Sequence, residues 1–185
     1  MNEDFKSLVI RLQNNDSLAQ KELYELFSVP MFNLCLRYIK NRQDAEEVLQ
    51  NSFIKVYENI HKINNPEALP SWIKRIFIHT SIDAVRKQRI FYPIEFINNH
   101  ASNSFADTKL NCFELVGLIE RLPFRSRQVF MLYEIEGYSH KEISEILKIT
   151  EGTSKSQLFF ARNRLKLSYN EANNVNSLNL RYEFD

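Results

Sequence analysis

The chain has 185 residues, of which 44% are hydrophobic and 25% charged, and its formal net charge is +1. This is the composition of an ordinary soluble protein, with enough residues for one large domain or two small ones. No apolar run approaches the roughly 18–20 residues of a membrane span, and residues 1–6 do not read as a signal peptide. We therefore expect a cytoplasmic protein without a membrane-inserted segment.

The sequence offers no group of residues typical of an active site or a metal centre. Cys35 and Cys112 lie in apolar surroundings without metal-ligand spacing, which fits a reduced compartment. The carboxylates of Glu46 and Glu47 are adjacent in sequence and diverge on a helix, and the histidines are scattered. We expect no enzymatic activity, no catalytic residue, no metal and no cofactor.

Apolar residues recur at helical spacing through the first half of the chain. The predicted helices span residues 4–13, 17–40 with an interruption near Pro30, 45–60 capped by Asp44, and about 71–89 capped by Ser71. The segment from Asn64 to Pro70 cannot be regular helix throughout, because its two prolines restrict the backbone.

From Phe91 to Leu110 the periodicity disappears, which is typical of a linker. It returns at Phe113–Leu122, stops at Pro123 and resumes at Arg125–Ile135, and an Asn-rich tail closes the chain. The fold class is therefore all-α. We expect two small helical domains at residues 1–90 and 113–170, a flexible linker at 91–112 and a disordered tail at 171–185.

The stretch from Ser139 to Leu167 has the pattern of a helix-turn-helix. Ser139 with Glu142 three residues later forms a capping box that opens a short helix, and Thr150 is the N-cap candidate of a second helix. Two helices joined by a turn of about 3–4 residues form the motif whose second helix enters the DNA major groove. The alternative is an ordinary helical hairpin in an all-α domain.

The second helix carries residues that favour DNA binding. Between Glu151 and Lys166, four basic residues stand against one acid. Its first turns present Thr153, Ser154, Ser156 and Gln157, whose short polar side chains can approach base edges and phosphates closely.

A second basic stretch lies between Lys74 and Arg89, where five basic residues stand against a single acid. Aromatic residues accompany it, and rings beside positive charge are how proteins hold unpaired bases. The residues concerned are Trp72, Phe77 and His79, with Lys74, Arg75 and Arg86. The alternative is that Trp72 and Phe77 are simply core residues.

The order of these segments across the chain resembles that of RNA polymerase sigma-70 family factors of the extracytoplasmic-function (ECF) type. The segments that carry the resemblance are Asp44–Tyr57, Ser71–Ile76, Ile82–Lys87, Leu122–Phe130 and Tyr138–Ser156. The match covers about residues 5–168 and implies the family's region 2 at about 5–90 and region 4 at about 113–168.

The resemblance also implies a role for particular residues. The polar side of the acidic helix would meet the polymerase clamp through Asp44, Glu47 and Gln50, with Phe53 and Tyr57 turned mostly inward. The melted −10 strand would be held by Asn64, Asn65, Trp72, Lys74, Arg75, His79 and Arg86. The −35 element would be bound by Thr153, Lys155, Ser156, Gln157, Phe159 and Arg162. Among these, Arg162 is expected to contact phosphate.

Four positions depart from the family pattern. Ser154 stands where an aliphatic residue is usual, Gln157 and Phe160 where basic residues are common, and His79 where Asn is frequent beside the −10 pocket. These departures concern the promoter sequence that is read rather than the class of protein.

The partners implied are core RNA polymerase, promoter DNA and an anti-sigma factor, which in this family can be membrane-bound. Two alternatives remain open. One is a stand-alone helix-turn-helix regulator, and the other is a sigma-like protein that binds an anti-sigma factor without initiating transcription.

Overall fold

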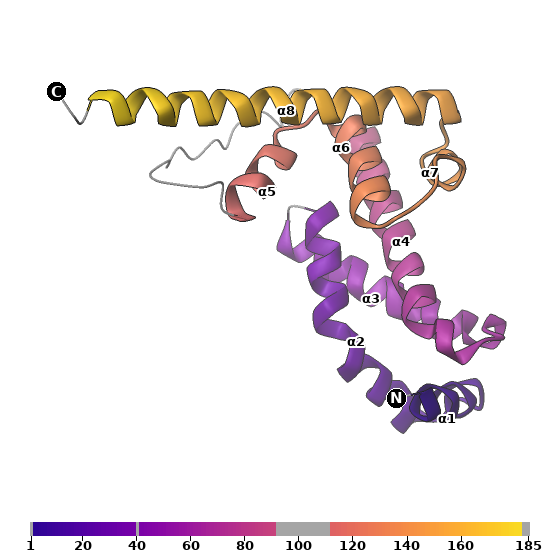
Figure 1. Ribbon diagram of the computed structural model, residues 1–185. Helices are drawn as coiled ribbons and strands as arrows, with labels where there is room; N and C mark the ends of the chain where they lie inside the picture. Colours follow the sequence, from indigo (N-terminus) through magenta and orange to yellow (C-terminus); the bar gives the residue numbers. More distant parts are fainter. Residues whose placement is uncertain (1, 40, 92–111, 183–185) are drawn as a thin grey trace. The chain divides into compact units, whose positions relative to one another are not determined.

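The computed structural model describes residues 2–39, 41–91 and 112–182, with side chains for 5–39, 41–87 and 116–170. All regular structure in these ranges is helical, as the sequence predicted, and it falls into two compact units within residues 1–98 and 99–185 (Figure 1). The predicted linker lies largely outside the described residues. No described helix combines the length and the hydropathy that crossing a membrane would require.

Unit 1 is built from α2 and α3 packed against α4, with α1 against α2. Its elements are α1 (Asn2–Gln13), α2 (Ser17–Tyr38), α3 (Arg42–Asn59), the short 3-10 helices η1 (Ile60–Lys62) and η2 (Pro66–Ala68), and α4 (Leu69–Phe91).

Aromatic rings form the centre of unit 1. Phe77 is fully buried and meets Phe53 edge-on, with ring centroids 5.1 Å apart. Tyr57 donates its hydroxyl to the Gln20 carbonyl oxygen at 3.1 Å, which ties α3 to α2. Phe77 is therefore a core residue, as the alternative interpretation held. Cys35 is also buried, and burial raises the pKa of its thiol to about 11.

Helix boundaries in unit 1 differ from the sequence prediction. Asn41, rather than Asp44, caps α3, because its Oδ1 accepts the Gln43 N–H at 2.9 Å while its own backbone is extended. Likewise α4 begins at Leu69, before Ser71, whose hydroxyl donates to the Ala68 carbonyl oxygen. Asp44 instead lies in the first turn of α3, where the helix dipole favours an acid.

Pro30 does not interrupt α2, which is continuous from Ser17 to Tyr38. Proline lacks a backbone N–H, so one intrahelical hydrogen bond is missing at this point. Phe27, Met31 and Leu34, which lie near Pro30 on the same helix, are buried. Their packing stabilises α2 where this hydrogen bond is missing.

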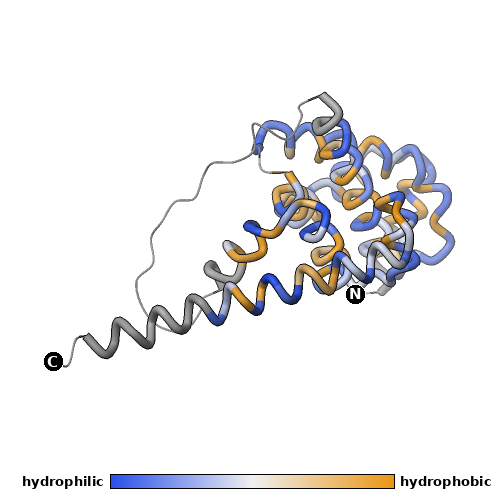
Figure 2. Tube along the Cα trace, turned by 90° about the horizontal axis from the view of Figure 1, so that it is seen from above, coloured by the Kyte–Doolittle hydropathy of each residue, from blue (hydrophilic) through white to orange (hydrophobic). Residues whose placement is uncertain are grey.

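Unit 2 contains α5 (Cys112–Glu120), α6 (Phe124–Phe130), the π-helix η4 (Met131–Ile135), α7 (His140–Leu147) and α8 (Glu151–Tyr182). Its buried apolar residues come from all of these elements: Leu118, Leu122, Val129, Leu132, Ile143, Leu158 and Ala161. Figure 2 shows hydrophobic and hydrophilic residues alternating along the coloured, N-terminal part of α8. This alternation is the stripe that seats α8 on α6 and α7.

The predicted helix-turn-helix is present. Ser139 and Glu142 form the capping box of α7, and Thr150 Oγ1 accepts the Thr153 N–H at 3.1 Å to cap α8. Between them Lys148 adopts a left-handed conformation, with φ of 55°, that ends α7.

Two segments of unit 2 differ from expectation. The helix predicted at Arg125–Ile135 changes to π geometry at Met131, where the Glu136 N–H bonds to the Met131 carbonyl oxygen at 3.0 Å. The tail expected to be disordered from residue 171 has helical backbone as far as Tyr182. That segment contains no proline, which would remove a backbone N–H donor. It also contains no glycine, whose conformational freedom weakens a helix.

Candidate nucleic-acid interface

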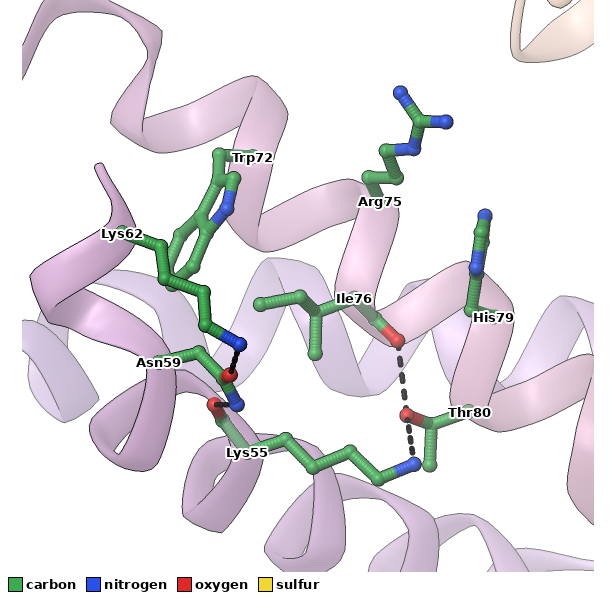
Figure 3. A pocket seen from close by; sticks show the side chains of 8 residues that line it. All are labelled: Lys55, Asn59, Lys62, Trp72, Arg75, Ile76, His79 and Thr80. Carbon is green, nitrogen blue, oxygen red and sulfur yellow. Dashed lines mark hydrogen bonds between the residues drawn. The ribbon is translucent and has the colours of Figure 1, made fainter. Parts of the chain in front are cut away.

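Unit 1 contains a cavity of about 290 Å³ between α3 with η1 on one side and α4 on the other. Its lining residues are Lys55, Asn59, Lys62, Trp72, Arg75, Ile76, His79 and Thr80 (Figure 3). Three of these side chains are cationic and none is acidic. The cavity therefore combines positive charge with the flat ring of a tryptophan.

Hydrogen bonds hold two of the cations in place. The Lys55 ammonium donates to Thr80 Oγ1 at 3.2 Å, and that hydroxyl donates in turn to the Ile76 carbonyl oxygen at 2.9 Å. The Lys62 ammonium donates to Asn59 Oδ1 at 2.6 Å, and Asn59 Nδ2 donates to the Lys55 carbonyl oxygen at 2.8 Å (Figure 3).

His79 adds an uncharged ring to the same wall. Burial lowers the pKa of His79 below its ordinary value, and the nearby Arg75 guanidinium lowers it further, while Asp83 opposes the shift. The imidazole is therefore neutral at pH 7. It presents a flat surface rather than a further positive charge.

The structure brings together only some of the residues expected to hold the −10 strand. Trp72, Arg75 and His79 line the cavity. Asn64 and Asn65 are exposed on the connection before α4, where Asn65 Oδ1 accepts the Glu67 N–H and so caps η2.

Lys74 and Arg86 lie outside the cavity lining. Lys74 is half-buried on α4, and Arg86 is joined to Asp83 by an ion pair of 3.1 Å. Lys55, Asn59 and Thr80 were missed by the sequence interpretation. The spacing of Lys55 and Asn59 puts them on one face of α3, but only the packing of α3 on α4 brings that face to Thr80.

In unit 2, the exposed side of α8 carries Lys155, Ser156 and Phe159, whose side chain is 68% exposed. Thr153 and Gln157 are half-buried beside them. An aromatic side chain this exposed on a charged helix is available to contact a partner surface.

Ser154 faces the interior and is fully buried. Its Oγ lies 2.9 Å from His140 Nδ1, forming a hydrogen bond between α7 and α8. This partner explains how a polar residue occupies a position where an aliphatic one is usual.

Arg162 is held by a neighbouring acid within unit 2. Its Nε and Nη2 lie 2.7 and 2.6 Å from Glu134 Oε1, and the guanidinium lies over the Tyr133 ring at 5.6 Å. Tyr133 in turn stacks on His140 with ring centroids 4.6 Å apart.

The acidic helix α3 exposes Glu47 and Gln50, with Asp44 half-buried one turn before them. Ile54 lies on the same side and is 53% exposed. Glu46, one turn before Gln50, forms an ion pair of 3.0 Å with Arg42. A polar strip with one apolar side chain is thus available on α3 for a protein partner.

Comparison with known proteins defines the class. The sigma-70 region 2 family matches residues 23–90, and the sigma-70 region 4 family matches residues 112–165. The chain is 30% identical over 158 residues to the ECF RNA polymerase sigma factor SigM of Bacillus subtilis, covering 83% of this chain and 96% of that one. It is 28% identical over 176 residues to the ECF RNA polymerase sigma-E factor of Haemophilus influenzae, covering 87% and 93%.

Two solved structures share the fold. One is CnrH in complex with the cytosolic domain of CnrY, with a TM-score of 0.52, 16% identity and coverage of 89% of this chain and 96% of that one. The other is RpoE in complex with the anti-sigma factor NepR from Bartonella quintana, with a TM-score of 0.53, 20% identity and coverage of 79% and 93%. The chain belongs to the sigma-70 family, in its ECF group, which confirms the resemblance drawn from the sequence.

Proposed function

We propose that the chain binds core RNA polymerase through the exposed strip of α3 and directs it to promoters that have both a −10 and a −35 element. The observation that carries this proposal is the presence of sigma-70 regions 2 and 4, in that order, on one chain. Unit 1 then holds the melted −10 strand, and unit 2 docks α8 on the −35 duplex.

The cavity of unit 1 supports the −10 assignment. Its three cations match the charge of a nucleic-acid backbone, and Trp72 with the neutral His79 ring offers surfaces on which unpaired bases stack. Duplex DNA is too wide for a cavity of about 290 Å³, whereas one extruded nucleotide is of suitable size.

The second helix of the helix-turn-helix supports the −35 assignment. Lys155, Ser156 and Phe159 are exposed together near the N-terminal end of α8, the part of such a helix that meets base edges. Arg162 lies two turns further along and contacts phosphate. Thr153 and Gln157 complete the surface.

An anti-sigma protein is the proposed regulator of the chain, acting in the cytoplasm where polymerase works. The support is that the two solved structures described above are complexes, one with the cytosolic domain of CnrY and the other with the anti-sigma factor NepR.

A binding experiment on promoter fragments tests the proposal. Fragments that core polymerase retains only with the chain present are selected from a pooled genomic library. A sigma factor yields fragments with two conserved blocks, and retention requires both proteins. A stand-alone helix-turn-helix regulator would retain duplex without polymerase, and a protein that only binds an anti-sigma factor would retain none in either case.

A further inference from the structure

The lysines of the unit 1 cavity differ from five other cations of the described chain, which are paired with acids. Arg11, Lys21, Arg42, Arg86 and Arg162 are each paired with a carboxylate. By contrast, the hydrogen-bond acceptors of Lys55 and Lys62 are a hydroxyl and an amide, which are neutral. Neither ammonium is paired with a carboxylate among the described residues, so both charges are available to an anion from outside the chain.

The two acceptors are themselves oriented by the backbone. Thr80 is almost fully buried and donates its hydroxyl hydrogen to the Ile76 carbonyl oxygen, so its lone pairs face Lys55. Asn59 donates its amide to the Lys55 carbonyl oxygen, so its Oδ1 faces Lys62. Each ammonium uses one of its three N–H donors here and keeps two for a ligand.

We infer that Thr80 and Asn59 are positioning residues, which hold the ammonium groups of Lys55 and Lys62 as two fixed phosphate contacts for a single strand entering this cavity. The inference rests on the proposed function and deepens it. An exposed lysine loses side-chain entropy when it binds, and holding the ammonium in place beforehand reduces that loss.

The same geometry assigns Asn59 to positioning rather than to reading base identity. One N–H of its amide donates to the Lys55 carbonyl oxygen and its Oδ1 accepts from the Lys62 ammonium, so the orientation of the amide is set by these two partners. Loss of Asn59 should therefore weaken single-strand binding equally for every base. The flat surfaces of Trp72 and His79, rather than Asn59, contact the base.

The test uses holoenzyme, assembled from core polymerase and the full chain, with a fluorescent single-stranded oligonucleotide that carries the −10 sequence of a promoter it transcribes. The dissociation constant is measured over a range of salt concentrations. Each of Lys55→Met and Lys62→Met should reduce the salt slope by about 0.7, which corresponds to an affinity loss of about fourfold at 0.15 M salt. Lys21→Met, on the exposed side of α2, is the matched control and should change neither quantity.

The positioning residues are tested by comparing close variants. Thr80→Val should weaken binding as Lys55→Met does and add nothing to it in the double variant, whereas Thr80→Ser, which keeps the hydroxyl, should restore the parent value. Asn59→Ala should weaken binding as Lys62→Met does and add nothing to it in the double variant. It should also leave the affinity ranking of the four bases unchanged. Circular dichroism melting identifies any variant that fails to fold.

Four results would overturn the inference. Parent-like salt slopes in both lysine variants would show that neither lysine contacts phosphate. The proposed function would still stand, provided that the parent holoenzyme binds the strand. A changed base ranking in Asn59→Ala, or equal losses in Thr80→Val and Thr80→Ser, would remove the positioning role. Failure of the parent holoenzyme to bind the strand or to transcribe would overturn the proposed function and this inference together.

Discussion

Arg162 and Glu134, although 28 residues apart in sequence, are joined by a hydrogen bond from Nε and an ion-pair contact from Nη2 to a single carboxylate oxygen. The pair fixes the guanidinium over Tyr133. Of the five N–H donors of an arginine, two are used here and three remain. Arg162 can therefore contact a DNA phosphate without giving up Glu134.

The first prediction concerns Arg162 and the −35 element. Arg162→Ala should weaken binding of holoenzyme to all −35 variants alike and reduce the salt slope by about 0.9, the value for one phosphate on duplex DNA. Lys155→Ala or Ser156→Ala should instead change the ranking among −35 variants by about 1–3 kcal/mol. Competition binding with a set of −35 variants measures both effects.

Arg164 supplies the control for this prediction, because it is exposed on a different side of α8. Arg164→Ala should leave the ranking and most of the affinity unchanged. If Arg162→Ala behaved like Arg164→Ala, Arg162 would serve only to join α8 to η4.

A second prediction concerns the buried hydrogen bond between Ser154 and His140. His140→Ala leaves the buried Ser154 hydroxyl without its partner, which should cost about 1–3 kcal/mol. Adding Ser154→Ala should recover part of this loss, because no unpaired hydroxyl then remains. Hydrogen exchange of the α7 and α8 amides, followed by mass spectrometry, measures the change within unit 2. Strictly additive losses in the double variant would show that the two side chains are not coupled.

A third prediction concerns the strip on α3. Replacing both Asp44 and Glu47 with Lys should weaken binding to core polymerase while leaving the helix content unchanged, because complementary charge on the partner then meets like charge. Glu25→Lys, which replaces an exposed acid on α2 instead of α3, is the control. Binding of the labelled chain to core polymerase gives the comparison. Unchanged affinity after the double reversal would mean that this side of α3 is simply solvated.

A fourth prediction follows from the lowered pKa of His79. The unfolded chain takes up a proton at this residue more readily than the folded chain does. The free energy of unfolding of unit 1 should therefore be insensitive to His79 above about pH 6.5 and should fall as the pH drops below that value. Urea unfolding followed by fluorescence of Trp72, the sole tryptophan, reports on unit 1.

His79→Asn should flatten this acid-side loss, whereas His61→Asn, at an exposed position on η1, should not. A stability that rises as the pH falls through 6.5 would reverse the sign and contradict the assignment of a neutral, half-buried ring.

The sequence was sufficient for features that depend on neighbouring residues. The apolar spacing in α3, the capping box at Ser139 and the cap at Thr150 are local patterns, and all are present in the structure. The sequence was a less reliable guide to helix boundaries where two nearby residues can both act as the N-cap. Asn41 and Asp44 can both cap a helix, and Asn41 does so here because its backbone is extended and its side chain accepts the Gln43 N–H.

Features that depend on tertiary packing could not be predicted from the sequence. Lys55 joins the cavity only because α3 packs against α4. Similarly, Arg162 appears from the sequence as a free cation on a basic helix. Its pairing with Glu134 depends on how η4 and α8 meet, which no spacing rule expresses.

Run-off transcription tests the central claim most directly. Core polymerase, the full chain and a template with matched −10 and −35 elements should give a transcript of defined length. Scrambling either element, or omitting the chain, should abolish that transcript. If core polymerase with the chain gave no more defined product than core polymerase alone, on any promoter fragment that the pair retains, the chain would not direct initiation and the account would be wrong.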